Sequence, residues 1–190
     1  MIIINNINKH FAGNSLISVD TTLIVSKIIE IEDLVFFVDR NNYVKSINVL
    51  SNLKYGIKEK KFYTANLDEL DLIKRAALDN NLIIKDKPKF IYGEILKREI
   101  HPKSNKLFVL TVSDLQREFQ IVTNTLDSLE GRVLVCALPG SLTSSGLEIL
   151  PGKVMDIESN GMVVGYKTLS FDKEGLIFGT KENIGKEFII

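Results

Sequence analysis

Four basic side chains cluster within ten residues in the second half of the chain. They surround a short polar loop, His101 to Asn105, that separates two runs of β-strand character. The four are Lys97, Arg98, Lys103 and Lys106. Only Glu99 opposes them between residues 97 and 106, so the local excess is three positive charges (4 − 1 = +3). Because ammonium and guanidinium groups neutralise phosphates, this turn is predicted to bind a polyanion, and the alternative is an ordinary solvated edge.

A second polar loop, from Ser159 to Met162, comes just before another predicted strand. Within it, Gly161 is expected to meet a backbone need, either a positive φ or a close approach. Met162 is interpreted equally well as core or as a ligand contact. Two polar loops on a small sheet are typical of a five-stranded barrel that presents one face to an oligonucleotide. The sequence therefore predicts nucleic-acid binding.

The residues that could carry other chemistry lack the partners that such chemistry needs. His101 has only His10 as a second histidine, which predicts a turn-stabilising or RNA-contacting role rather than a metal site. Ser159 lies in no GxSxG elbow and has no histidine nearby. Cys136 lies in the apolar run VLVCAL, where a buried thiol is expected. The sequence predicts no enzyme, no metal and no cofactor.

Composition narrows the setting without selecting a ligand. The 190 residues carry 24 basic and 24 acidic side chains, so no global field attracts polyanions. One cysteine fits a reducing compartment. The first residues form too short an apolar run for a signal peptide, and no stretch reaches the roughly 18 to 20 apolar residues that span a bilayer. The expected location is the cytoplasm.

The loops must be positioned by the elements around them, and the chain divides into two predicted domains. Residues 1–87 are predicted to form a small α+β domain of unassigned role, with antiparallel strands followed by a helix from Asn66 to about Asp79, whose first turn is acidic. The predicted strands of this domain are residues 1–4, 16–19, 22–30, 33–39 and 43–50. The charged segment Lys85 to Lys89, with Pro88, marks the boundary because its charges resist burial.

Residues 88–190 are predicted to form the five-stranded barrel, which makes the whole protein mainly β. Its predicted strands are residues 90–99, 107–114, 119–123, 132–137 and 162–167. A hairpin is expected at Pro151 and Gly152. The apolar segments of the tail, Leu176 to Phe178 and Phe188 to Ile190, are predicted to add strands, cap the barrel or meet a second subunit.

Several of these stretches resemble one family, the tRNA-binding domain. It occurs in stand-alone bacterial tRNA-binding proteins, in cytokine-like cofactors of animal synthetase complexes, and near the N-terminus of the bacterial phenylalanyl-tRNA synthetase β subunit. The resemblance covers about half the chain, and the layout of residues 1–87 is similar to the extra domain of the YtpR-type bacterial subgroup. The residues that carry it are Gly93, HPKSNKL at His101 to Leu107, QIV at Gln120 to Val122, the run ending in ALPG at Val133 to Gly140, and ESNGM at Glu158 to Met162.

The resemblance implies an OB-fold that grips the outer corner of tRNA by shape, in a translation-associated role and without a catalytic step. Carried over by position, Lys106 and the loop of Ser159, Asn160 and Met162 would border the RNA. A lysine neutralises phosphate, while serine and asparagine bond to phosphate or 2′-hydroxyl oxygens. With the basic turn, the predicted RNA-binding set is Lys97, Arg98, His101, Lys103, Asn105, Lys106, Ser159, Asn160 and Met162.

The chain departs from the family pattern in ways that motivate a second hypothesis. Met155 and Asp156 stand where the family often has a basic residue and then glycine, and the segment Thr123 to Asp127 stands where the family commonly has a turn of small residues and asparagine. From Pro88 onward there are 12 basic and 13 acidic residues (12 − 13 = −1). The alternative function is therefore a protein-interaction or assembly adaptor with weak or lost RNA binding. A homodimer, or a protein partner that binds through the C-terminal strands, is a further expectation.

Overall fold

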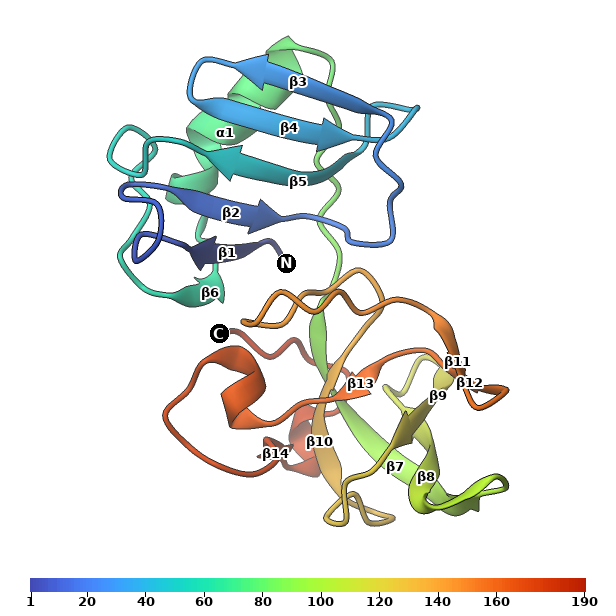
Figure 1. The fold of residues 1–190 in the computed structure, drawn as a ribbon. Helices are drawn as coiled ribbons and strands as arrows, with labels where there is room; N and C mark the ends of the chain where they lie inside the picture. The colour runs from blue at the N-terminus through green and yellow to red at the C-terminus, as the bar shows by residue number, and fades with distance from the viewer.

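The computed structural model describes residues 1–190 and arranges them in two stacked halves (Figure 1). The upper half is a six-stranded sheet with one helix behind it, and the lower half is built on a second six-stranded sheet. Both sheets are antiparallel and the protein is mainly β, as predicted. No helix is long and apolar enough to cross a membrane.

The upper sheet has the strand order β3-β4-β5-β2-β1-β6. Its elements are β1 (Ile3–Asn6), β2 (Ser15–Ser18), β3 (Lys27–Ile31), β4 (Leu34–Val38), β5 (Val44–Val49), β6 (Phe62–Thr64) and α1 (Leu67–Asp79). The prediction of antiparallel strands followed by a helix is confirmed. Two details were wrong: β6 was missed, and the strand expected from Thr22 begins only at Lys27 because residues 20–26 form a loop.

Helix α1 begins where its sequence signals indicate. The Asn66 side chain accepts a hydrogen bond from the Glu69 amide at 2.8 Å, and the Glu69 carboxylate accepts one from the Asn66 amide at 3.0 Å. This capping box satisfies amides that have no partner inside the helix. The apolar stripe of Leu70, Ile73 and Ala77 is buried against the sheet.

Strand β1 links the two halves through its alternating side chains. Ile2 and Ile4 point into the core beneath α1. Ile3 points the other way, into a cluster that also contains Phe62 from the upper half and Phe90 from the lower half. A strand presents successive side chains to opposite faces, so this short segment contributes to both cores and packs the halves against each other.

The connecting segment is only partly exposed, which corrects one expectation. Lys87 lies on the surface and its ammonium is 2.9 Å from a carboxylate oxygen of Asp20. Lys89 is 1 % exposed. Its burial lowers the pKa of its ammonium to about 8, while the negative charge of Asp20 opposes that shift. The prediction that the charges of this segment resist burial was wrong for Lys89 because a carboxylate from the other half compensates it.

The lower sheet has the order β13-β10-β7-β8-β9, and β14 pairs with the same edge of β10 as β13 does, at Val133 and Leu134. Its elements, with a separate hairpin of β11 and β12 and two 3-10 helices, are β7 (Phe90–His101), β8 (Ser104–Ser113), β9 (Glu118–Thr123), β10 (Val133–Ala137), β11 (Gly152–Val154), β12 (Ile157–Ser159), β13 (Met162–Val163), η1 (Tyr166–Leu169), β14 (Phe178–Gly179) and η2 (Lys181–Asn183). Cys136 is completely buried, as expected, and burial raises the pKa of its thiol.

The predicted closed barrel is not present, because no strand ladder joins β13 to β9. Individual hydrogen bonds approach closure: the Asn160 amide donates to the Gln120 carbonyl at 2.8 Å, and the Gln120 side-chain amide donates to the Glu158 carbonyl at 2.6 Å. The fifth strand is also shorter than predicted, since β13 ends at Val163 and η1 follows. The short strand leaves too little backbone for a ladder.

The C-terminal tail folds back onto the lower sheet. β14 pairs with β10 as a short added strand, which was one of the three possibilities predicted for the tail. Ile177 and Ile190 are buried in the cluster between the halves, while Phe178 and Ile189 remain 41 % and 62 % exposed. Part of the tail's apolar surface is therefore buried within the chain, and Phe178 and Ile189 remain exposed.

Candidate nucleic-acid interface

The β7–β8 hairpin has a tighter turn than its sequence suggested. His101 pairs with Ser104, so only Pro102 and Lys103 form the loop, and the strand expected from Leu107 begins three residues earlier. The register then shifts, because Ile100 pairs with Phe108. The extra residues on β8 bulge outward, which leaves Asn105 and Lys106 exposed.

His101 fixes this turn from the inside. It is 2 % exposed. Its Nδ1 accepts the Lys103 amide hydrogen at 3.1 Å, so Nε2 is the protonated nitrogen that donates to the Val154 carbonyl at 3.0 Å. The buried ring has no free nitrogen for RNA. Of the two roles expected for His101, the geometry supports the turn-stabilising one.

The β11–β12 hairpin lies directly against this turn. Its own turn is formed by Met155 and Asp156, with φ of +47° and +72°, four residues after the expected hairpin at Pro151 and Gly152. The Asp156 carboxylate forms an ion pair with the Lys103 ammonium. Together with the His101 contact to Val154, this pair holds the two hairpins side by side. We call residues 97–106 and 152–160 the hairpin rim.

The ESNGM loop connects the hairpin rim to the sheet. Ser159 is 9 % exposed, and its hydroxyl accepts the Val122 amide hydrogen at 3.1 Å and donates to the Gly161 carbonyl at 3.3 Å. Met162 is half-buried against the cluster between the halves. Both side chains therefore have structural partners, whereas Asn160 is half-buried and its side chain makes no hydrogen bond within the chain.

The basic side chains of the first loop differ in their partners. The Lys97 ammonium is 2.9 Å from the Glu99 carboxylate. The Arg98 guanidinium lies 3.4 Å from the centre of the Phe108 ring, and its buried Nε has no hydrogen-bond partner. Lys106 is exposed and forms no ion pair. The unpaired cations of this group are therefore Arg98 and Lys106.

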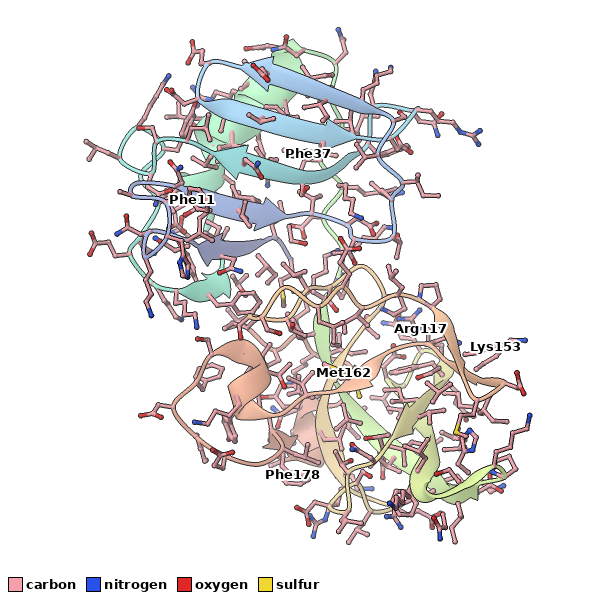
Figure 2. All side chains as sticks on the ribbon, viewed as in Figure 1. Phe11, Phe37, Arg117, Lys153, Met162 and Phe178 are labelled. Carbon is pink, nitrogen blue, oxygen red and sulfur yellow. The ribbon has the colours of Figure 1, made fainter.

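Lys153 was missed by the sequence reasoning and belongs to the same rim. All of β11 is exposed, and Lys153 lies opposite Glu158 in the hairpin register without forming an ion pair. Figure 2 shows it projecting from this hairpin, while Met162 lies near the centre of the lower half. In the sequence, Lys153 is a single lysine between Pro151-Gly152 and Met155-Asp156. Its place on the rim could be inferred only once the turn was known to lie at Met155 and Asp156.

The local charge of the rim is smaller than the linear sequence implied. It carries Lys97, Arg98, Lys103, Lys106 and Lys153 against Glu99, Asp156 and Glu158, an excess of two (5 − 3 = +2). Glu130 adds a further carboxylate, since its Oε1 accepts the Arg98 amide hydrogen at 2.7 Å. Polar side chains and unpaired cations on a sheet edge can bind a phosphate backbone, with modest electrostatic attraction.

The family assignment agrees with these residues. Residues 90–186 match the family described as "Putative tRNA binding domain". The chain belongs to this tRNA-binding domain family, and the resemblance predicted from the sequence is confirmed.

Among curated proteins, the chain is similar to one described as "Putative tRNA-binding protein YtpR" of Bacillus subtilis, with 29% identity over 102 residues, 54% of this chain and 51% of that protein. It is also similar to the phenylalanine–tRNA ligase beta subunit of Hahella chejuensis, 35% identical over 89 residues, 46% of this chain and 11% of the subunit. The chain therefore spans about half of the first relative and about a tenth of the second.

Among solved structures, a protein from Pyrococcus horikoshii described as MetRS-related aligns with 56% of this chain and 99% of its own, at 24% identity and a TM-score of 0.41.

Proposed function

We propose that this protein binds tRNA at the hairpin rim, recognising its shape and backbone without catalysing a reaction. The observation that carries the proposal is the fastening of the two hairpins by His101 and Asp156, which brings both polar loops to one edge of a sheet in a chain of the tRNA-binding family. A rigid edge of this kind positions phosphate contacts without reading base sequence.

The fold proposal is an OB-fold in an open form. The order of the lower sheet, together with the hydrogen bonds from Asn160 and Gln120 that approach closure, supports it. OB-folds are partly open five-stranded barrels that bind oligonucleotides on one face and its adjoining loops. The proposed domain boundary falls between residues 87 and 88.

Within the proposed site, residues divide by what they can reach. The proposed contact residues are exposed or half-buried polar side chains of the rim: Lys97, Arg98, Lys103, Asn105, Lys106, Lys153 and Asn160. The proposed positioning residues are His101, Ser159 and Met162, whose side chains have partners within the protein. Unpaired Lys106 and Lys153 should contribute most to the electrostatic part of binding.

A salt titration tests the function. The full chain should retain total tRNA in a filter assay more tightly than single-stranded DNA of equal length, with a log–log salt slope of roughly −0.7 to −0.9 per phosphate contact. Lys106→Ala should weaken binding to all tRNAs alike and flatten the slope by about one contact. Equal retention of wild type and variant at every salt concentration would remove Lys106 from the site.

Asp156 is expected to lower the affinity for tRNA, because its carboxylate forms an ion pair with the Lys103 ammonium and competes with phosphate for it. Asp156→Asn keeps the size of the side chain, and asparagine tolerates the left-handed backbone at this position. It should raise tRNA affinity about two- to fivefold at low salt, as expected when one exposed ion pair is released. Glu182→Gln, a change of the same charge on η2, provides the control, and an unchanged affinity of Asp156→Asn would show that Lys103 makes no contact.

The second candidate function is a protein-interaction or assembly adaptor with weak RNA binding. The ion pairs that occupy Lys97 and Lys103, and the exposed Phe178 and Ile189 of the tail, favour it. It predicts weak retention of tRNA with little dependence on salt, and recovery of a stoichiometric protein partner from RNase-treated lysate. Loss of that partner in Phe178→Ser would assign the interaction to the tail.

A further inference from the structure

A polar cavity of about 210 Å³ lies between the two halves, away from the hairpin rim. Its floor is the face of the upper sheet opposite α1, formed by β1, β2 and β5. Its cover is the segment between β10 and β11, which runs along the top of the lower half beneath β1 and β2 (Figure 1). Leu142, Gly146 and Glu148 of this segment line the cavity.

Direct contacts hold the cover in place. The Thr21 amide donates to the Gly140 carbonyl at 3.1 Å, and its hydroxyl donates to the Ser141 carbonyl at 3.1 Å. The Lys45 ammonium lies 2.9 Å and 3.2 Å from the two carboxylate oxygens of Glu148. The cavity is therefore built from two fixed surfaces.

The floor carries polar side chains in two rows across the strands. In one row, Asn48 of β5 and Asn5 of β1 lie on either side of Leu16 of β2. In the next row, Ser46 of β5 lies opposite Ser18 of β2. The result is a leucine platform with a carboxamide at each side and two hydroxyls at one end.

These four polar side chains have no partner within the protein. Thr21 and Lys45 bond across the junction, but the side chains of Asn5, Asn48, Ser18 and Ser46 make no intramolecular hydrogen bond, although Ser18 is only 5 % exposed. Asn5, Ser46 and Asn48 are half-buried, so their polar atoms are reached from the cavity rather than sealed in the core. The cavity therefore offers free hydrogen-bond donors and acceptors to a ligand that displaces water from it.

The chemistry of the lining selects the kind of ligand. Lys45 is the only cation that lines the cavity, and its ammonium is already paired with the Glu148 carboxylate. A phosphate would therefore gain little electrostatic attraction there. Carboxamides offer adjacent donor and acceptor groups that match the edge of a nucleobase, and asparagine pairs well with adenine. A flat apolar floor suits a ring. The volume of about 210 Å³ lies below the roughly 300–1,000 Å³ of sites for drug-sized ligands, so the cavity holds no more than one nucleoside.

We propose that this junction cavity, lined by Asn5, Leu16, Ser18, Ser46 and Asn48, binds a single neutral purine nucleoside, supplied either as a free molecule or as an unstacked nucleotide base of an RNA. The site gives residues 1–87 a ligand-binding role that is separate from the hairpin rim. It does not depend on tRNA binding at the rim, because the two sets of residues do not overlap.

The test is calorimetric titration of the full chain with adenosine, with adenosine monophosphate, uridine and ribose as comparators. Saturable binding of adenosine is expected, with weaker binding of the comparators. Asn48→Ala and Asn5→Ala should each lower adenosine affinity at least tenfold. Asn41→Ala, which removes an exposed carboxamide from the loop between β4 and β5, should leave it unchanged, and thermal melting would verify that all variants fold.

The outcomes separate support from refutation and identify the source of the ligand. Absence of saturable adenosine binding, equal binding by Asn48→Ala, or ribose or adenosine monophosphate binding more tightly than adenosine would each overturn the proposal. If the base comes from RNA, Asn48→Ala also weakens tRNA binding without changing the salt slope. If the ligand is a free nucleoside, Asn48→Ala loses adenosine binding while tRNA affinity is unaltered.

Discussion

Gly161→Ala is expected to lower the free energy of unfolding by about 2–4 kcal/mol, and to weaken any ligand binding at the hairpin rim with it. A Cβ atom at this position would lie 2.7 Å from the Ala137 carbonyl oxygen, and φ is +153°. The obstructing atom belongs to the backbone of central strand β10, so no side chain can rotate away. Residues 159–162 would have to move off the sheet.

That displacement would break the contacts that hold the rim. The Ser159 hydroxyl would lose the Val122 amide and the Asn160 amide would lose the Gln120 carbonyl. Chemical denaturation measures the stability change. Gly152→Ala is the matched control, because its φ is not positive and a Cβ there has no heavy atom within 4 Å. Equal stability of the two variants would show that the ESNGM loop adjusts without cost.

Local signals were sufficient to predict the parts of the fold that depend on neighbouring residues. Helix α1 is capped by Asn66 and ends at Asp79 as expected, because capping and periodicity are properties of a short window. The β7–β8 hairpin and the backbone requirement at Gly161 were also predicted. The bulge after Ile100 was not, since a register shift depends on the partner strand.

Features set by distant partners were beyond sequence reasoning. Lys89 looked like part of an exposed connection and is buried because Asp20, 69 residues earlier (89 − 20 = 69), faces it. His101 looked available for RNA and is buried because it meets Val154. Lys103 belonged to an apparently free basic cluster, and Asp156 pairs with it. In each case the missing information was a contact between segments far apart in sequence.

These pairings leave the rim, which carries an excess of only two positive charges, with few free cations. Cations that pair with local carboxylates fix the geometry of the two hairpins, and the remaining unpaired cations are left to attract phosphate. Exposed ion pairs contribute little stability, typically below about 1 kcal/mol. Arg98 is also unpaired, but it is half-buried with its guanidinium over the Phe108 ring. The electrostatic part of any RNA affinity should therefore be concentrated in the exposed Lys106 and Lys153, one on each hairpin.

The double variant Lys106→Glu, Lys153→Glu is expected to lower tRNA affinity on the order of a hundredfold at about 0.1 M salt, and to flatten the salt slope by roughly 1.4 to 1.8 through the loss of two phosphate contacts. Both lysines are exposed and form no ion pair, so their replacement leaves the fold intact. Filter binding of total tRNA across a salt series measures both quantities.

The matched control is Lys9→Glu, Lys61→Glu in the upper half. These two lysines are also exposed and outside any ion pair, and the change takes the formal net charge from zero to −4 in both variants (0 − 4 = −4). A general repulsion between protein and tRNA would weaken both double variants equally. A local site at the rim requires that the control keep most of its affinity and its full salt slope, because exposed charges are screened with a Debye length of about 10 Å at 0.1 M and act only on phosphates close to them.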